Sequence, residues 1–157
     1  MATAASAAIG QRSLGDPSLL FPLDPPLLRG CPRTSTPDMQ FPLEIAFDYT
    51  KVSNNIFRQP PLPGLLRWAP LLPPLAAELS LGEGGTALVA SQRIARWIGI
   101  DGSIWLKDES RNPTWSHKDR LNYCIVSTAL ANGARGIAVA STGNHGASAA
   151  AYARRAG

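Results

Sequence analysis

A single lysine lies among acidic and polar side chains in the segment Asp108–Arg120, which reads DESRNPTWSHKDR. Lys118 falls at the start of an expected helix, with Ser116 as a candidate N-cap and Asp119 placed to complete a capping box. Lys118 and Arg120 in a first helical turn oppose the helix dipole, so helix stability does not explain them. A helix N-terminus, a neighbouring arginine and partial burial favour the neutral amine, which is the form that attacks a carbonyl. Lys118 is therefore a candidate nucleophile, although a surface lysine beside a helix start is the simpler interpretation of the local sequence.

The second cluster is the turn Ala140–Gly146, which reads ASTGNHG. If it joins a strand to a helix N-terminus, it offers backbone N–H groups, two hydroxyls and a carboxamide to an anion. Gly143 and Gly146 let the backbone come close to such a ligand. The spacing matches neither a Walker A loop, a Gly-x-Gly-x-x-Gly fingerprint nor a Gly-x-Ser-x-Gly elbow. An ordinary capped turn is the alternative, and His145 taken alone is more often a packing residue than a catalyst.

A glycine-rich third cluster, Leu81–Thr86 (LGEGGT), indicates a tight bend and nothing more specific.

The elements around these clusters follow a regular order. We expect a strand at Ser103–Lys107, then a helix whose apolar residues recur at helical spacing until Asn132-Gly133 ends it. A short apolar strand at Gly136–Ala140 and an alanine-rich helix at Ala147–Ala156 follow. Strand, helix, strand, helix predicts an α/β fold with a parallel sheet whose faces are covered.

The upstream half is organised differently, because thirteen of the fourteen prolines lie between Pro17 and Pro74. Proline removes a backbone donor and biases its predecessor toward extended geometry, which disfavours helices and central strands. We expect residues 1–40 to form a disordered or irregular tail and residues 41–80 a Pro-rich N-terminal arm with one or two short helices. Residues 81–157 would then begin the α/β domain.

Composition excludes several classes of protein. The chain has 157 residues, 45% of them hydrophobic, and a formal charge of +4, which suits one soluble domain. It has no apolar stretch long enough for a membrane helix, and its start lacks the basic region of a signal peptide. Cys31 and Cys124 have no neighbours at metal-ligand spacing, so we expect no metal site, no disulfide and a cytoplasmic location. Scattered arginines argue against nucleic acid as a partner, whereas a small anionic ligand is compatible.

Size sets a further expectation. Two parallel strands and their helices bury too little surface to be stable alone, and the sequence stops at Gly157, where a helix should lead to a third strand. We therefore expect an N-terminal fragment of a larger α/β enzyme, with a complete small domain as the alternative.

Three segments together resemble threonine synthase, a fold type II pyridoxal-phosphate enzyme of the tryptophan synthase β-like superfamily. They are Leu81–Val89 (LGEGGTALV), Trp105–Arg120 (WLKDESRNPTWSHKDR) and Ala140–Gly157 (ASTGNHGASAAAYARRAG). Their order and spacing agree with the family as well. The resemblance is strong after Leu81 and weak between Phe41 and Leu81.

The resemblance implies specific roles. Lys118 would hold pyridoxal 5'-phosphate through its amine and later shuttle protons, and Asn144 would bind the phenolic oxygen of the cofactor. Ser141, Thr142, Gly143, Asn144 and His145 would form the loop that binds the carboxylate of an amino-acid substrate. The implied reaction converts O-phosphohomoserine and water into threonine and phosphate, in an enzyme that is commonly a homodimer.

Some features of the family pattern differ or lie outside this sequence. Trp115 and His117 replace the usual Gly and Phe around the serine before the lysine, and Ala87 replaces a proline. These differences bear on the substrate more than on the cofactor. The family's glycine-rich phosphate loop and the hydroxyl that meets the pyridine nitrogen would follow Gly157. We therefore expect these 157 residues alone to bind the cofactor weakly and to be inactive.

Two alternatives remain open. One is another enzyme on the same scaffold, such as a serine/threonine dehydratase or a sulfur-transferring synthase, although the run Asp108–Asn112 favours threonine synthase. The other is a non-catalytic truncated relative that acts by binding. Intact Lys118 and Asn144 argue against it.

Overall fold

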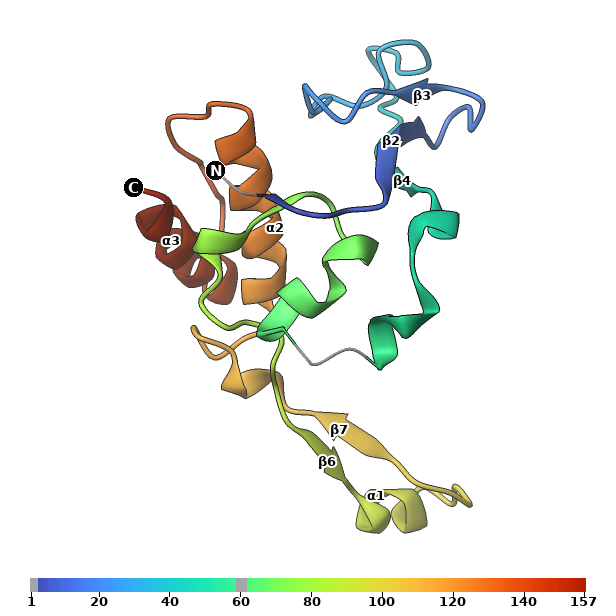
Figure 1. Ribbon diagram of the computed structural model, residues 1–157, viewed down its shortest axis with the longest axis vertical. Helices are drawn as coiled ribbons and strands as arrows, with labels where there is room; N and C mark the ends of the chain where they lie inside the picture. The colour runs from blue at the N-terminus through green and yellow to red at the C-terminus, as the bar shows by residue number, and fades with distance from the viewer. Residues whose placement is uncertain (1–2, 59–61) are drawn as a thin grey trace.

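Two helices, α2 (Lys118–Ala131) and α3 (Asn144–Ala156), pack against each other in the computed structural model, which describes residues 3–58 and 62–157 (Figure 1). A third, short helix, α1 (Gln92–Trp97), lies at the far end of the molecule. The strands are β1 (Thr3–Ala4), β2 (Ala8–Ser13), β3 (Leu20–Phe21), β4 (Leu43–Phe47), β5 (Leu75–Ala76), β6 (Leu88–Ala90) and β7 (Trp105–Lys107). Five 3-10 turns complete the order: η1 (Tyr49–Lys51), η2 (Asn54–Phe57), η3 (Gly64–Leu71), η4 (Ala77–Leu79) and η5 (Glu109–Arg111).

The strands form three small antiparallel sheets among the described residues: β3-β2-β4, β1-β5 and β6-β7. The first sheet shows that the expectation of an irregular tail over residues 1–40 is wrong for β2 and β3. Gln11 of β2 explains how a Pro-rich loop can pack there. Its side-chain amide donates to the carbonyls of Pro22 (2.6 Å) and Pro25 (3.0 Å) and accepts from the N–H of Leu27 (2.8 Å). These bonds stabilise a loop whose prolines cannot donate.

The α/β class is confirmed, whereas the pairing of the two expected strands differs from the prediction. The expected strand at Ser103–Lys107 appears as β7, but β7 pairs antiparallel with β6. Gly136–Ala140 is largely exposed and forms no strand. A parallel strand needs a hydrogen-bonding neighbour, and the part of the chain that the structure describes places none beside this segment.

The two long helices match the sequence more closely. Helix α2 ends at Ala131 with Asn132 as its C-cap, and Gly133 follows with a φ of 66°, the left-handed conformation that glycine supplies at helix ends. Helix α3 begins at Asn144, three residues before the predicted start. Neither helix, nor any other in residues 3–58 and 62–157, is long and apolar enough to cross a membrane.

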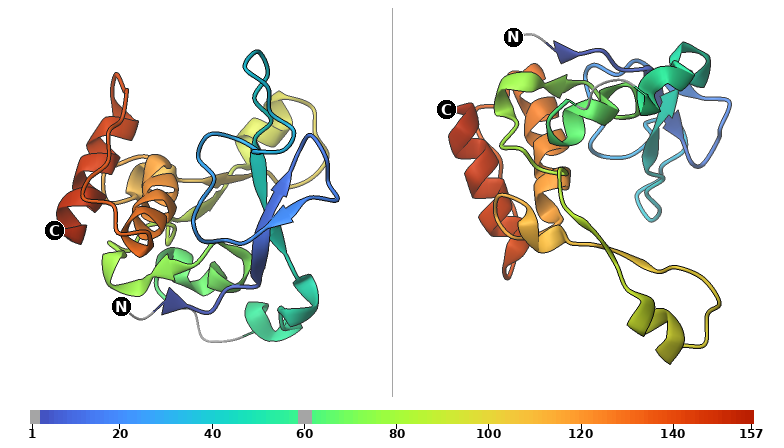
Figure 2. Two further views of the ribbon diagram at one scale, coloured as in Figure 1. Left: turned by 90° about the horizontal axis from the view of Figure 1, so that it is seen from above. Right: turned by 60° about the horizontal axis from the view of Figure 1, so that its bottom comes forward.

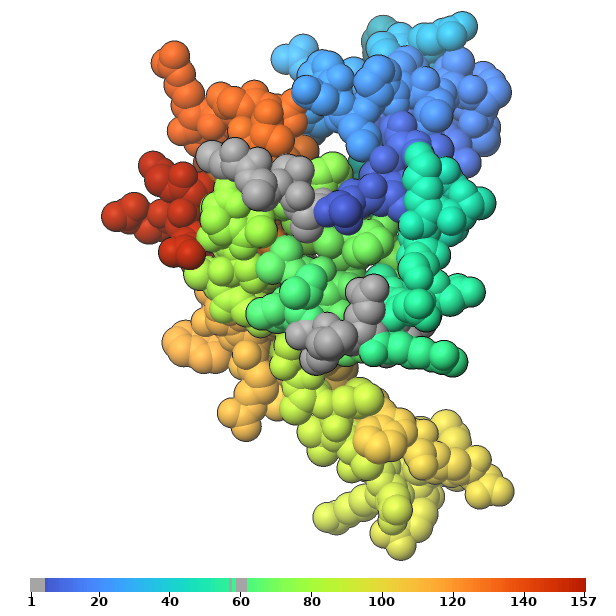
Figure 3. Space-filling view, viewed as in Figure 1, coloured from blue at the N-terminus to red at the C-terminus, as the bar shows by residue number. Residues whose placement is uncertain are grey.

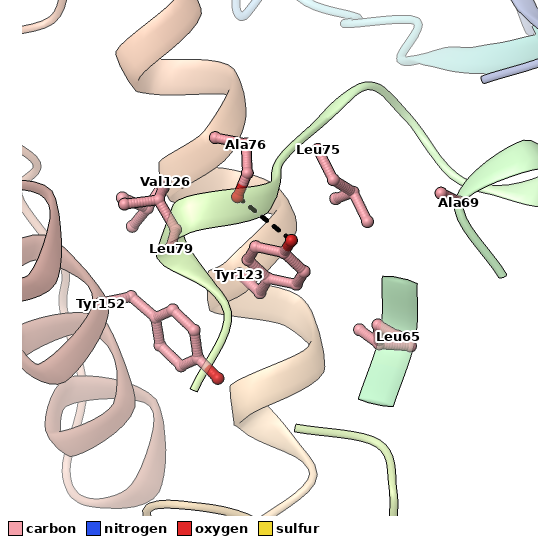
Figure 4. Close-up of a cluster of buried hydrophobic side chains, with 8 residues drawn as sticks. All are labelled: Leu65, Ala69, Leu75, Ala76, Leu79, Tyr123, Val126 and Tyr152. Carbon is pink, nitrogen blue, oxygen red and sulfur yellow. Dashed lines mark hydrogen bonds between the residues drawn. The ribbon is translucent and has the colours of Figure 1, made fainter. Parts of the chain in front are cut away.

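The core lies where β5 and η3 meet α2 and α3 (Figure 4). Tyr123 of α2 and Tyr152 of α3 are fully buried, with ring centroids 6.0 Å apart. Tyr123 donates to the carbonyl of Ala76 at 3.1 Å, and Ser127 accepts from the N–H of the same residue at 3.1 Å. Both backbone groups of Ala76 thus bond to α2, which fixes this helix against the segment that leads to the LGEGGT bend.

A hairpin formed by β6, α1 and β7, here the β6–β7 hairpin (Leu88–Lys107), projects from the rest of the molecule (Figures 1 and 2). The space-filling view shows it as a narrow extension below the helices (Figure 3). Most of its large apolar side chains are exposed, and Trp97 is the extreme at 85%. The hairpin joins the LGEGGT bend to the loop that precedes Lys118.

Candidate functional site

Lys118 is the first residue of α2 and is partly exposed, as predicted for a lysine at a helix start. Its N–H donates to the hydroxyl of Ser116 at 3.1 Å, so Ser116 does bind a first-turn donor. The structural N-cap is His117, one residue later than predicted, and its side chain makes no capping bond.

The prediction that Asp119 completes a capping box is wrong, because its carboxylate binds other donors than the N-cap backbone. Its carboxylate is fully buried and accepts from the N–H (2.7 Å) and hydroxyl (2.5 Å) of Thr114 and from the hydroxyl of Ser148 (2.6 Å). Asp119 therefore connects the loop before Lys118 to helix α3. A buried carboxylate with three donors is stable in this setting, and it fixes the backbone on both sides of the lysine.

Arg120 is occupied by an ion pair with Glu109. Its Nε and Nη2 atoms lie 2.8 and 2.7 Å from the two carboxylate oxygens, which is bidentate geometry. The Arg120 guanidinium, assisted by Asn112, lowers the pKa of Glu109 to about 2. The sequence predicts that the charge of Arg120 acts on Lys118. In the structure its charge is balanced by Glu109, and it ties α2 to η5.

The LGEGGT bend is more than the tight turn the sequence indicated. Glu83 is fully buried and accepts from the Tyr152 hydroxyl (2.6 Å), the N–H of Leu81 (2.9 Å) and the Ser80 hydroxyl (3.0 Å). The Glu83 carbonyl also accepts from the N–H of Leu65 at 2.8 Å. A Cβ on Gly64, whose φ is +57°, would come within 2.0 Å of this carbonyl oxygen, so only glycine fits there.

The same bend reaches the loop before the lysine. The N–H of Gly84 donates to Asn112 Oδ1 at 2.9 Å, and the Thr86 hydroxyl donates to Glu109 at 3.2 Å. Asn112 in turn donates to Glu109 at 2.8 Å. Two of the segments singled out in the sequence, Leu81–Thr86 and Asp108–Arg120, are therefore one hydrogen-bonded unit.

The predicted anion-binding turn lies at the start of α3. Ser141 Oγ accepts from the N–H groups of Gly143 (3.2 Å) and Gly146 (2.9 Å). Ser141, Thr142, Gly143 and Asn144 are exposed, and His145 is half-buried. Within residues 3–58 and 62–157, no acceptor binds the N–H of Asn144 or His145. A Cβ at Gly143 would meet no atom within 4 Å, so the turn borders open space.

Lys118 and the turn lie at the same end of the helix pair. Asn122, one turn after Lys118, contacts His145 at the start of α3. Near the other end, Val126 and Leu130 of α2 line a pocket of about 350 Å³ with Ala153 and Ala156 of α3. The helices therefore run in the same direction, so that both first turns, and both predicted ligand-binding groups, meet at one end.

Two pockets lie away from this end of the helix pair. The cavity of about 350 Å³ and a second one of about 150 Å³, bordered by Gln11 and Pro74, include neither Lys118 nor Asn144 in their walls. Among the described residues no group of three His, Cys, Asp or Glu side chains is placed to hold a metal ion. Ser141 to Asn144 are exposed and Lys118 is partly exposed, so the candidate site lies at the surface between two helix N-termini.

Comparison with known proteins assigns the class. The model of the pyridoxal-phosphate dependent enzyme family matches residues 79–157, half of the chain, and the chain belongs to this family. Pyridoxal phosphate is therefore the cofactor of the class. No solved structure gives a significant match.

Individual relatives are threonine synthases. The chain is 52% identical over 79 residues to threonine synthase from Mycobacterium leprae, and this match covers 50% of the chain and 21% of that protein. It is 36% identical over 116 residues to threonine synthase from Methanosarcina acetivorans, and 38% identical over 121 residues to that from Methanocaldococcus jannaschii. Those matches cover 73% of the chain and 28% and 29% of the relatives. The resemblance to threonine synthase is thereby confirmed, and the chain spans less than a third of these relatives.

Proposed function

We propose that this chain carries the lysine-bearing part of a threonine synthase-like active site, which converts O-phosphohomoserine and water into threonine and phosphate. One observation carries the proposal. Lys118 and the Ser141–His145 turn, which the resemblance assigns to cofactor and substrate, start two parallel helices and meet at the same end. A cytoplasmic homodimer is part of the same proposal.

The residues present fit pyridoxal phosphate. Lys118 is partly exposed at the helix start, and its amine makes no ion pair with the residues that the structure describes. Asn144 is exposed beside the open space at Gly143. Lys118 would hold the cofactor covalently, and the Asn144 amide would bind its phenolic oxygen. When bound, the cofactor supplies an electron sink for bonds at the substrate α-carbon.

The protein side of the chemistry follows from the frame around the lysine. Asp119 and Ser116 fix the backbone of the first turn of α2, which limits the positions that the Lys118 amine can reach. A neutral amine there can accept and return a proton. The N–H groups of Asn144 and His145 at the α3 terminus are donors for a substrate carboxylate, with the helix dipole favouring the negative charge.

Lysine attachment is tested by incubating the chain with pyridoxal phosphate, reducing with borohydride and mapping the adduct by mass spectrometry. The three lysines are Lys51, Lys107 and Lys118. We expect the adduct to form preferentially on Lys118 and to disappear in Lys118→Ala. Lys51→Ala, in an exposed lysine paired with Asp48 in η1, is the matched control. Equal labelling of all three lysines would contradict the proposal.

The reaction is tested in a chimera in which residues 79–157, the part that the family model matches, replace the corresponding segment of the Mycobacterium leprae threonine synthase. We expect the chimera to release phosphate from O-phosphohomoserine and the 157-residue chain alone to be inactive. Lys118→Ala should abolish the activity of the chimera. Ketoacid formation from threonine, in place of phosphate release, would indicate the dehydratase alternative. Sedimentation of the active chimera tests the homodimer.

A further inference from the structure

Asn122 is a fully buried amide between the two groups of the candidate site. Its Nδ2 atom lies 3.1 Å from the carbonyl oxygen of Lys118, 3.2 Å from Nδ1 of His145 and 3.4 Å from the carbonyl oxygen of His145. Asn122 lies one helical turn after Lys118, so its amide contacts both the backbone of Lys118 and the turn that starts α3. It is the side chain that joins the two first turns.

The two backbone carbonyls determine which way the amide points. Both are acceptors only, so the atom that faces them must be the NH₂ group. With the amide reversed, Oδ1 would face two carbonyl oxygens and repel both. Nδ2 therefore has two hydrogens for three acceptors, and one of these acceptors is the ring nitrogen Nδ1 of His145.

The oxygen of the same amide has no hydrogen-bond donor among the described residues. Asn122 Oδ1 is buried and accepts no hydrogen bond from any residue that the structure describes. A buried acceptor without a donor costs stability, whereas an apolar side chain of the same size would avoid that cost. The unpartnered oxygen therefore gives no reason for an amide at this position. The reason lies in the contacts that the Nδ2 donor makes.

We propose that Asn122 is a positioning residue that holds neutral His145 in the tautomer with its proton on Nε2. A ring nitrogen that accepts an N–H bond carries no proton, so in a neutral imidazole the proton is on the other nitrogen. His145 then offers an Nε2–H donor, and not a base, beside Asn144. That this donor serves an anionic oxygen of the substrate rests on the proposed function; the tautomer itself does not.

The test is the tautomer of His145, measured by long-range ¹H–¹⁵N correlation spectroscopy of the full ¹⁵N-labelled chain at a pH where its ring is neutral. The chain has two histidines, so His117→Gln assigns the signals. We expect Nδ1 of His145 to give the signal of an unprotonated nitrogen and Nε2 that of a protonated one. A protonated Nδ1 in the unaltered chain overturns the inference, whatever the variants do.

Variants then show that Asn122 is the cause. Asn122→Leu keeps the branched shape and the number of heavy atoms and removes the unpartnered oxygen, so the chain should still fold. We expect it to lower the ratio of the Nε2–H to the Nδ1–H form about five-fold, as the loss of one hydrogen bond predicts. Asn132→Ala is the matched control, because the Asn132 amide also donates to a carbonyl one turn back, that of Thr128 at 2.8 Å, but lies at the other end of α2. An unchanged ratio in Asn122→Leu would overturn the role of Asn122.

This outcome is separate from that of the proposed function. Selective labelling of Lys118 with a mixed His145 tautomer would leave the function supported and the inference wrong. A single His145 tautomer together with equal labelling of all three lysines would support the inference and contradict the proposed function.

Discussion

The helix pair and the β6–β7 hairpin differ in what they bury. Around α2 and α3, polar side chains such as Glu83, Asp119 and Ser148 are fully buried and bonded to one another or to the backbone. In the hairpin, large apolar side chains such as Trp97 (85%) and Leu88 (59%) are exposed. The frame around Lys118 is therefore held by specific hydrogen bonds within these residues, whereas the hairpin adds little to it.

The largest effect should come from breaking the buried polar frame at Glu83. Glu83→Ala leaves the buried Tyr152 hydroxyl without its acceptor, and it also removes the acceptor of the Leu81 N–H. We expect the free energy of unfolding, measured by urea denaturation, to fall by about 3 kcal/mol. Glu78→Ala, at an exposed carboxylate in η4, should change it by less than about 0.5 kcal/mol. Equal effects would show that the two carboxylates are equally solvated and that the frame is not buried in solution.

The pair Glu109–Arg120 gives the frame a dependence on pH. Because the Arg120 guanidinium lowers the pKa of Glu109 from 4.5 to about 2, the folded state favours the carboxylate. Its contribution is complete above pH 4.5 and is lost as the pH falls toward 2. The Glu109 side chain is 28% exposed, and we expect solvent screening to reduce the contribution to about 1–2 kcal/mol.

The measurement is the difference between the unaltered chain and Glu109→Gln in urea unfolding at several pH values. The difference should be largest near neutral pH and shrink at acid pH. Glu44→Gln is the control, because the Arg12–Glu44 pair is exposed on both sides at 42% and 47%. A difference for Glu109→Gln that is the same at all pH values would rule out the lowered pKa of Glu109 as its source.

The sequence predicted the local features of the site better than the distant ones. Periodicity and end signals predict three features to within a few residues: the helix start at Lys118, the helix end before the C-cap Asn132, and the turn before α3. Glu83 and Asn122 were missed, because their partners Tyr152 and His145 lie 69 and 23 residues away along the chain. A Glu between glycines carries no local signal that it will be buried.

The missed strand β2 has a similar cause. Nothing near residue 11 shows that Gln11 will bind carbonyls in a Pro-rich loop eleven or more residues later. The opposite error, at Gly136–Ala140, arises because an apolar run predicts a strand only if a neighbouring strand pairs with it.

Trp115 tests whether the loop before Lys118 is strained. It is the one non-glycine residue with a positive φ, 60°, among the described residues, and it is 81% exposed. Glycine adopts this conformation freely. We expect Trp115→Gly to be about 1 kcal/mol more stable than Trp115→Ala in urea unfolding, since both lose the ring and only alanine keeps the strain. Equal stability would show that residue 115 leaves the left-handed region once the ring is removed.

The smallest effect should come from the hairpin. Trp97, at the end of α1, is 85% exposed, so Trp97→Ser removes little buried surface. We expect the free energy of unfolding to change by less than about 0.5 kcal/mol. The fluorescence that is lost in Trp97→Phe, relative to the unaltered chain, should have the emission of a solvated indole. A loss near 3 kcal/mol, typical of a buried aromatic side chain, would mean that the hairpin is covered in solution. The contrast with the helix pair would then be wrong, because both regions would be packed.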